Sequence, residues 1–273
     1  MIDPIRLLTG AVLALVISVL AYRARSLNRS GALAATLLGT VVFGLGGLAW
    51  AVLLIGFFVS SSALSRLSAG RKRSLNEKFS KGSQRDAGQV LANGAVAGLC
   101  VLLQLLFPGQ AWPWLAFAGS LAAVNADTWG TELGVLSRTS PVLITTGRPV
   151  ERGTSGGISL AGTLAALGGG LFIALLALLF DPAPGLAWGV LPVVGLAGLL
   201  GSLVDSALGA TVQAIYVCPA CNKETERHPL HTCGTPTQWI RGWRWMDNDW
   251  VNITCALAGG AAAALLGSGL GWF

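Results

Sequence analysis

The chain has 273 residues, of which 53% are hydrophobic and only 11% are charged, whereas soluble domains carry about 25% charged residues. This composition excludes an ordinary soluble enzyme and predicts one integral membrane domain over residues 1–273. The net charge of +6 does not indicate a nucleic-acid partner, because the basic residues are distributed between the apolar runs.

Eight apolar runs follow one another along the chain, and we predict an all-α polytopic bundle of about seven to eight transmembrane helices. They lie near 5–22, 31–46, 48–65, 87–107, 112–136, 157–180, 186–212 and 250–271. We interpret the first run as a span and not as a signal peptide, because basic residues follow it and no small-residue cleavage site is evident. The second is short and Gly-rich, so a re-entrant or tilted segment is the alternative there.

The segments between these runs alternate between the two sides of the membrane. All of the 18 Lys and Arg residues except Arg6 then fall on one side, in the segments 23–30, 66–86, 137–156 and 213–249. By the positive-inside rule this side is cytoplasmic and both termini face out. We therefore expect the active face at the cytoplasmic surface of the inner or plasma membrane.

Residues 66–86 form the most basic segment, and its end is typical of a phosphate site. Lys81 and Arg85 accompany Gly, hydroxyl and amide groups at the start of the fourth run, and a helix N-terminus with cationic side chains binds phosphate readily. Asn93 follows Gln89 by four residues, so one polar ridge continues into the membrane. The alternative is an orienting loop that contacts anionic lipids.

The fifth run contains the strongest functional signal, which is a polar cluster inside an apolar span. Its candidate site residues are Asn125, Asp127, Thr128 and Glu132. Each unpaired ion at this depth would cost several kcal/mol in lipid. Such groups are kept where they face a protein interior, a wet cavity or a cation, so we expect a functional site here.

Residues 145–159 form a Gly- and hydroxyl-rich loop that leads directly into the sixth run. Exposed backbone N–H groups and the following helix N-terminus can cradle phosphate oxygens. The loop does not match the Walker A pattern, and a plain turn is the alternative. The candidate phosphate-binding residues are Arg148, Arg152, Gly153, Thr154, Ser155, Gly156 and Gly157.

Two carboxylates from different spans are the expected centre of the chemistry. Asp205 in the seventh run shares a helix face with two serines, and we predict that it meets Asp127. Carboxylate oxygens completed by phosphate and water suit Mg²⁺. Glu132 lies about 140° from Asp127 around an ideal helix, so it joins these ligands only if Gly130 breaks the helix. Alternatively, the acids pair with loop arginines or relay protons in a transporter.

The cytoplasmic loop 213–249 carries the pattern C-x2-C-x9-H-x-C at Cys218, Cys221, His231 and Cys233. Three thiolates and an imidazole suit a closed tetrahedral site for structural Zn²⁺, and a cytoplasmic location disfavours a disulfide. We predict a small zinc-stapled knuckle, with reduced free thiols as the alternative. His228 is an alternate ligand, although a surface position is favoured for it.

Polar residues also stand at the start of the last run. They are Asp247, Asn248, Asp249 and Asn252. At least one is expected to cap the helix, and the others are candidates for holding a metal or nucleotide.

Several motifs occur in a fixed order along nearly the entire chain. They are K-x-x-x-R-D-x-x-Q-V-x-x-N-G at 81–94, N-A-D-T-W-G-T-E-x-G at 125–134, G-R-P-V-x-x-G-T-S-G-G-I-S at 147–159, D-S-x-L-G-A-T-x-Q at 205–213, C-x-x-C followed by T-E-R, and D-N-D-x-V-N at 247–252. This combination resembles the domain-of-unknown-function 92 family of integral membrane proteins, which includes transmembrane protein 19 and a plastid phytyl-phosphate kinase. The resemblance implies a polytopic membrane protein that converts phytyl phosphate to its diphosphate. The implied donor is a nucleoside triphosphate, CTP by analogy with related polyprenol and phytol kinases.

We therefore predict a membrane kinase that uses Mg²⁺ and CTP to phosphorylate an isoprenoid-alcohol monophosphate within the lipid bilayer. Asp127 and Asp205 would hold the metal, while Lys81 and Arg85 would neutralise phosphate charge. Phosphoryl transfer depends mainly on positioning and charge stabilisation, so no Ser-His or Cys-His nucleophile is required. A lipid-phosphate cytidylyltransferase, an ion- or proton-coupled transporter and a purely structural role are the alternatives.

Overall fold

The computed structural model describes residues 3–68, 70, 77–79, 81, 84–137, 139–181 and 187–271. Part of the predicted basic segment 66–86, including Gly82 and Ser83, therefore lies outside the described residues. The helices are α1 (Pro4–Arg23), α2 (Arg29–Val41), α3 (Leu48–Ser68), α4 (Ala87–Leu106), α5 (Trp112–Gly134), α6 (Leu160–Leu179), α7 (Val190–Thr211) and α8 (Asn248–Gly269). A π-helical turn, η1 (Val42–Gly46), continues α2, and a 3₁₀ turn, η3 (Ala187–Gly189), leads into α7. The chain is thus an all-α membrane bundle, as predicted.

Seven helices in the described part of the chain are long and apolar enough to cross a membrane, and α2 counts among them together with η1. The second run is therefore a helix of 18 residues, Arg29–Gly46. The helix ends at Gly46, and the next residue, Gly47, has a φ of +88°, which lies outside the range that other residues adopt readily.

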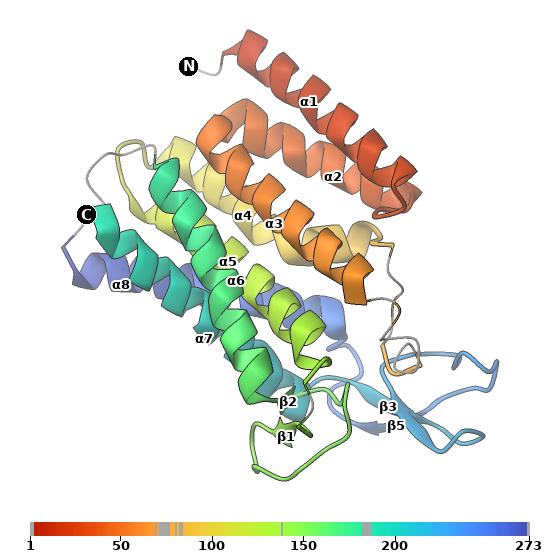
Figure 1. The fold of residues 1–273 in the computed structure, drawn as a ribbon. Helices are drawn as coiled ribbons and strands as arrows, with labels where there is room; N and C mark the ends of the chain where they lie inside the picture. The colour runs from red at the N-terminus through yellow and green to blue at the C-terminus, as the bar shows by residue number, and fades with distance from the viewer. Residues whose placement is uncertain are drawn as a thin grey trace.

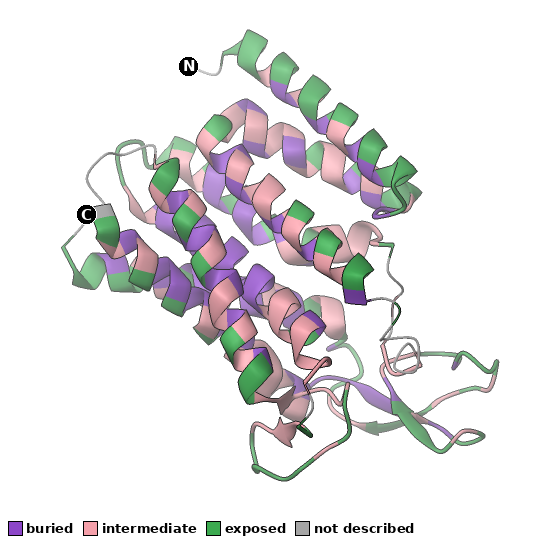
Figure 2. Ribbon diagram, viewed as in Figure 1, coloured by how far each residue is buried: buried purple, intermediate pink, exposed green. Residues whose placement is uncertain are grey.

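The remaining long helix, α5, lies at the centre of the bundle and packs against α3, α4, α6, α7 and α8 (Figures 1 and 2). Every residue from Pro113 to Ala126 is buried. Because protein surrounds α5 on all sides, its surface does not need the apolar composition of a lipid-facing helix. This position explains how the polar residues 125–132 are tolerated at membrane depth.

Glycines bring the central helices close enough for their backbones to touch. A Cβ at Gly119 of α5 would lie 2.5 Å from the carbonyl oxygen of Gly259 in α8, and one at Gly170 of α6 would lie 2.8 Å from that of Gly195 in α7. Without a hydrophobic force between helices in lipid, this close van der Waals contact holds them together. It accounts for part of the high glycine content and fixes α6, α7 and α8 around α5.

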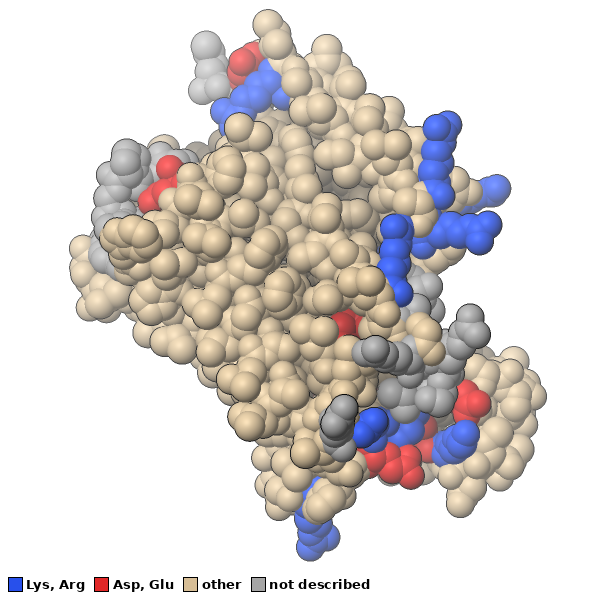
Figure 3. Space-filling model, in the orientation of Figure 1, with Lys and Arg blue, Asp and Glu red and all other residues tan. Residues whose placement is uncertain are grey.

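Two small sheets lie together at one end of the bundle (Figure 1). In the first, β1 (Val142–Leu143) pairs antiparallel with β2 (Gly157–Ile158). The second has the order β4-β3-β5, formed by β3 (Ile215–Cys218), β4 (Lys223–Thr225) and β5 (Gln238–Arg241). We call the end that carries these sheets the loop end. Lys and Arg visible in Figure 3 gather over the sheets and beside the neighbouring ends of α1 and α2, with a further group next to the N-terminus. The chain termini lie at the opposite end, as the alternating spans predict (Figure 1).

Candidate functional site

A cavity of about 470 Å³ opens at the loop end of the bundle. Its walls come mainly from α4, α5, α6 and α7, the loop before β2 and the segment after β4. Most of the candidate residues chosen from the sequence line it. They are Lys81, Arg85, Asn93, Asp127, Thr128, Glu132, Arg152, Gly153, Thr154, Ser155, Gly156, Gly157 and Asp205.

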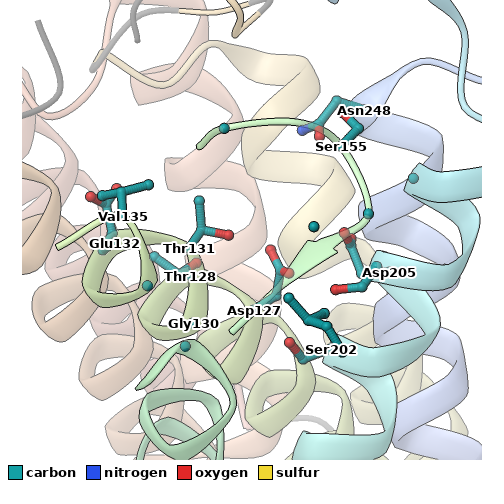
Figure 4. Close-up of a pocket in the computed structure, with 18 of the residues that line it drawn as sticks. Asp127, Thr128, Gly130, Thr131, Glu132, Val135, Ser155, Ser202, Asp205 and Asn248 are labelled. Carbon is teal, nitrogen blue, oxygen red and sulfur yellow. The ribbon is translucent and has the colours of Figure 1, made fainter. Parts of the chain in front are cut away.

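Asp127 of α5 and Asp205 of α7 face the same part of this cavity, beneath the loop that carries Ser155 (Figure 4). One carboxylate oxygen of Asp205, Oδ2, is buried and has no hydrogen-bond partner among the described residues. A buried charged oxygen without a partner is strongly unfavourable. The pair therefore fits a divalent cation with oxygen ligands, whose coordination shell would be completed by phosphate and water.

The loop above the two aspartates owes its shape to glycine. Gly153 and Gly156 have φ values of +76° and +83°, a left-handed conformation that favours glycine. Gly156 also packs against the backbone of Ala210 in α7, where a Cβ would lie 2.5 Å from the Ala210 nitrogen. Ser159 then caps α6 by accepting a 3.1 Å hydrogen bond from Gly162 N. The loop is thus fixed between α7 and a helix N-terminus, which favours anions.

Lys81 stands at the cavity wall near the start of α4. Its ammonium donates to Asp86 at 3.1 Å and also to Asp249 of α8. Burial opposes the charge on Lys81, but the hydrogen bonds to Asp249 and Asp86 outweigh burial and raise its pKa. Lys81 is therefore a cation that ties α4 to α8.

The Arg85 guanidinium lies against two aromatic rings of α3. Its carbon is 5.5 Å from the ring centroid of Phe57 and 5.8 Å from that of Phe58. Burial lowers the pKa of Arg85 to about 10, and the nearby Glu132 carboxylate partly opposes this change. Arg85 therefore carries its charge at neutral pH within a partly apolar setting.

Glu132 is held on another side of α5 from Asp127. The helix is continuous through Gly130, so the break that would turn Glu132 toward Asp127 does not occur, and Figure 4 shows the two side chains apart. The Glu132 carboxylate accepts hydrogen bonds from Ser65, at 2.7 Å, and Ser68 of α3. This arrangement places Glu132 in the packing between α3 and α5.

Two further candidates lie away from the cavity. Asn125 is fully buried, where it donates to the Gly169 carbonyl at 2.8 Å and accepts from Ser60 at 2.9 Å. It thereby joins α5 to α6 and α3. Arg148 is exposed in the turn between β1 and β2 and does not line the cavity.

The four predicted metal ligands meet in the loop after α7. Ligand atoms of Cys218, Cys221, His231 and Cys233 all lie within 4.8 Å of one another. The His231 Nδ1 is 3.2 Å from the Cys233 sulfur and 3.7 Å from the Cys221 sulfur, and the Cys218 and Cys233 sulfurs are 3.5 Å apart. Bonds of about 2.3 Å in a tetrahedral Zn–S site place ligand atoms about 3.8 Å apart. The cluster could therefore hold a tetrahedral metal ion.

His228 is not part of this cluster. Its ring stacks on Tyr216, with 4.6 Å between the ring centroids, and it is exposed.

Most of the chain is similar in sequence to known proteins. A family model described as integral membrane protein DUF92 covers residues 12–260. Protein PGR of Arabidopsis thaliana is 35% identical over an alignment that covers 92% of this chain and 93% of that protein. The chain belongs to the DUF92 family.

Two other proteins are also similar to this chain. An uncharacterised membrane protein of Methanocaldococcus jannaschii is 32% identical over 76% of this chain and 83% of its own length. Protein VTE6, chloroplastic, of Arabidopsis thaliana is 28% identical over 88% of this chain and 65% of its own length. No solved structure matches this chain.

Two residues that line the cavity of this DUF92 chain were not identified from the charge and spacing patterns. Both lie in the segment after β4. Glu226 and Arg227 line the cavity beside Gln213. The Glu226 carboxylate accepts hydrogen bonds from Ser155 at 2.7 Å and from Gln213 at 3.0 Å. The only sequence signal for Glu226 and Arg227 was the T-E-R motif after the C-x-x-C pair, which gave them no role. Glu226 therefore links the Gly-rich loop that carries Ser155 to the Cys/His segment after α7 through hydrogen bonds.

The polar start of α8 also contributes to the DUF92 cavity. Asp247 caps α8 by accepting from the nitrogens of Asp249 and Trp250, as expected for at least one residue of this group. Asn248 and Asn252 line the cavity, and Figure 4 places Asn248 close to Ser155. The site thus combines four acids, which are the aspartate pair and two glutamates, with several cations, backbone amides and neutral amides. Such a set is suited to a metal-bound polyphosphate.

Proposed function

We propose that this protein is a membrane kinase that transfers the γ-phosphoryl group of a nucleoside triphosphate to an isoprenoid-alcohol monophosphate. A phosphate oxygen of the lipid forms a bond to the γ-phosphorus while the bond from that phosphorus to the bridging oxygen breaks. The products are a lipid diphosphate and a nucleoside diphosphate. CTP is the donor implied by the family resemblance, and the site faces the cytoplasm in this proposal.

The adjacency of Asp127 and Asp205, with a buried carboxylate oxygen left unpaired, is the observation that carries this proposal. These two side chains would hold Mg²⁺, which neutralises charge on the phosphates when bound. The cavity places no Ser-His or Cys-His pair next to them among its lining residues. None is needed, because a lipid phosphate is already a competent nucleophile and the protein must mainly position it.

The remaining cavity residues have roles that follow from their charge and position. Arg85 and Lys81 stand on the α4 side, where they can neutralise the phosphate of the lipid. Arg152 and the backbone of Gly153 to Gly157 line the cavity from the loop that leads into β2, and they can cradle the nucleotide phosphates. The two phosphate groups would then meet at the aspartate pair.

Purified protein should be incubated with phytyl, geranylgeranyl or farnesyl phosphate, Mg²⁺ and each nucleoside triphosphate in turn. We expect a lipid diphosphate, and we expect Asp205→Asn to lower the rate by at least about 100-fold, because a metal ligand is lost. Glu224→Gln is the control, since Glu224 is exposed on β4 away from the cavity lining.

The same experiment separates the alternative functions. Release of diphosphate together with a lipid-linked nucleotide would identify a cytidylyltransferase. Absence of any product from folded protein, with ion uptake into liposomes, would favour a transporter and remove the kinase proposal.

We further propose that the four-residue Cys/His cluster holds a structural Zn²⁺. Its donor set and ligand separations fit this metal. Thr225, which follows within the same hairpin, donates to the Glu77 carbonyl at 2.6 Å, and the Glu226 nitrogen donates to the Lys78 carbonyl at 2.8 Å. A metal-stiffened knuckle would therefore hold both the segment before Lys81 and the Glu226 side of the cavity.

A further inference from the structure

A second, smaller cavity lies beside the polar one, between α1, α2, α3 and α4. We call it the apolar groove. Its walls are mainly aliphatic and aromatic, with Ile17 of α1, Leu38 of α2 and Phe58 of α3 among them. Apart from Ser18, its polar lining residues are Arg85, Gln89 and Asn93, which stand together at the start of α4.

These three residues also line the polar cavity. The groove and the aspartate site therefore share one wall, and an apolar space meets a cationic one at Arg85. Asn93 donates to the Gln89 carbonyl at 2.7 Å, and Gln89 accepts from the Asp86 nitrogen at 3.3 Å. Both side chains are thus tied to α4 itself. Arg85 brings a positive charge to the junction of the two cavities, near the Glu132 carboxylate and against the rings of Phe57 and Phe58.

We propose that the apolar groove binds the part of an isoprenoid chain that lies next to its phosphate. This inference rests on the proposed function and names the place of its lipid substrate. A phosphate at the junction would contact Arg85, while the first carbons of the chain would lie between α2 and α3. Arginine binds phosphate through paired hydrogen bonds, and apolar walls favour a hydrocarbon through the area that they remove from water or headgroups.

The position of the groove fits entry from the bilayer. The helix α1 packs mainly on α2 and η1 and stands at the edge of the bundle (Figure 1). Its outer residues are exposed, including Leu8 and Leu20, with exposed fractions of 67% and 58%. In the described part of the protein, only α1 and its contacts with α2 therefore separate this side of the groove from lipid, and in our proposal the chain enters beside α1.

The size of the groove sets what it can recognise. Its volume of about 80 Å³ is well below the roughly 300–1,000 Å³ of pockets that enclose a whole small molecule. The groove therefore holds only the first part of the chain, and the rest remains in lipid. We expect binding to depend on the structure next to the phosphate and to change little between farnesyl, geranylgeranyl and phytyl chains.

The test is photolabelling of the protein in phosphatidylcholine nanodiscs. The probe is farnesyl phosphate with a diazirine on its first isoprene unit, and labelled peptides are mapped by mass spectrometry. We expect labels on residues of the apolar groove, competed by phytyl phosphate and not by added phosphatidylcholine. Ala35→Phe, which narrows the groove from α2, should lower labelling by about tenfold or more, because space for at least one methylene is lost.

Ala95→Phe is the matched control, because Ala95 is exposed on α4 and does not line the groove. The Ala95→Phe variant should be labelled by the probe to the same extent as the native protein. If Ala35→Phe does not fold, Ile17→Phe narrows the same groove from α1. Labels outside the groove, unchanged labelling in a folded groove variant, or equal competition by phosphatidylcholine would each overturn the proposal. Specific labelling in a protein that forms no diphosphate would instead refute the kinase and leave the chain site standing.

Discussion

Replacing Gly156 with Ala should displace the loop over the aspartate pair. At φ +83°, an Ala costs about 1–2 kcal/mol in backbone conformation. The new Cβ would also lie 2.5 Å from the nitrogen and Cβ of Ala210, and relieving such overpacking costs about 1–3 kcal/mol. The free energy of unfolding should therefore fall by about 2–5 kcal/mol.

Gly147→Ala separates these two contributions. Gly147 has φ +67°, and no atom lies within 4 Å of a Cβ built there, so only the backbone contribution of about 1–2 kcal/mol applies. Thermal unfolding in one detergent, followed by tryptophan fluorescence, should show a clearly lower melting temperature for Gly156→Ala. In the proposed kinase assay a loop shift near 1 Å should lower the rate about 100-fold. Equal melting temperatures and equal rates for the two variants would show that the Ala210 contact does not hold this loop.

Three further outcomes are expected. Elemental analysis of the native protein should find one zinc ion per chain, and Cys221→Ser should lose this ion whereas His228→Ala should keep it. Zinc-free native protein would contradict the site. Lys81→Ala should lower the free energy of unfolding by about 1–3 kcal/mol, because Asp249 loses its cation. This value lies between those measured for breaking exposed and fully buried ion pairs, and unchanged thermal unfolding would contradict it. Without metal, Asp205→Asn should unfold at the same or a higher temperature than the native chain, because a buried charge is removed, and added Mg²⁺ should stabilise only the native chain. Equal stabilisation of both by Mg²⁺ would place the metal elsewhere.

The sequence allowed the helices to be predicted, since each span needs a long apolar stretch. It also allowed Asp127 and Asp205 to be placed together, because both stand near the same end of their spans. It did not reveal that the helix with Asp127 is the central one. Hydropathy shows which segments leave water, whereas the lateral order of helices depends on contacts such as that between Gly119 and Gly259.

The features of the site that could not be predicted from the sequence depend on contacts between segments that are distant along the chain. Helical geometry correctly separated Glu132 from Asp127, but the serines that bind Glu132 lie more than sixty positions earlier. The bond from Ser155 to Glu226 likewise spans 71 positions and depends on how the knuckle folds back. The sequence also did not show which of Arg148 and Arg152 lines the cavity. The fold of the segment between β1 and β2 decides this, and of the two only Arg152 lines the cavity.

The place of α5 links the architecture of the bundle to its chemistry. A helix that faced lipid could not keep Asp127, since an unpaired charge there costs several kcal/mol. Surrounding helices remove that contact with lipid, but burial alone would still leave the Asp205 oxygen without a partner. The cavity opening resolves this, because water and a cation can reach the pair from the loop end. In the proposed function, phosphate takes the same route and a hydrocarbon chain occupies the apolar groove at the shared wall formed by Arg85. A site with one polar and one apolar approach is what a substrate with a charged head and a lipid tail requires.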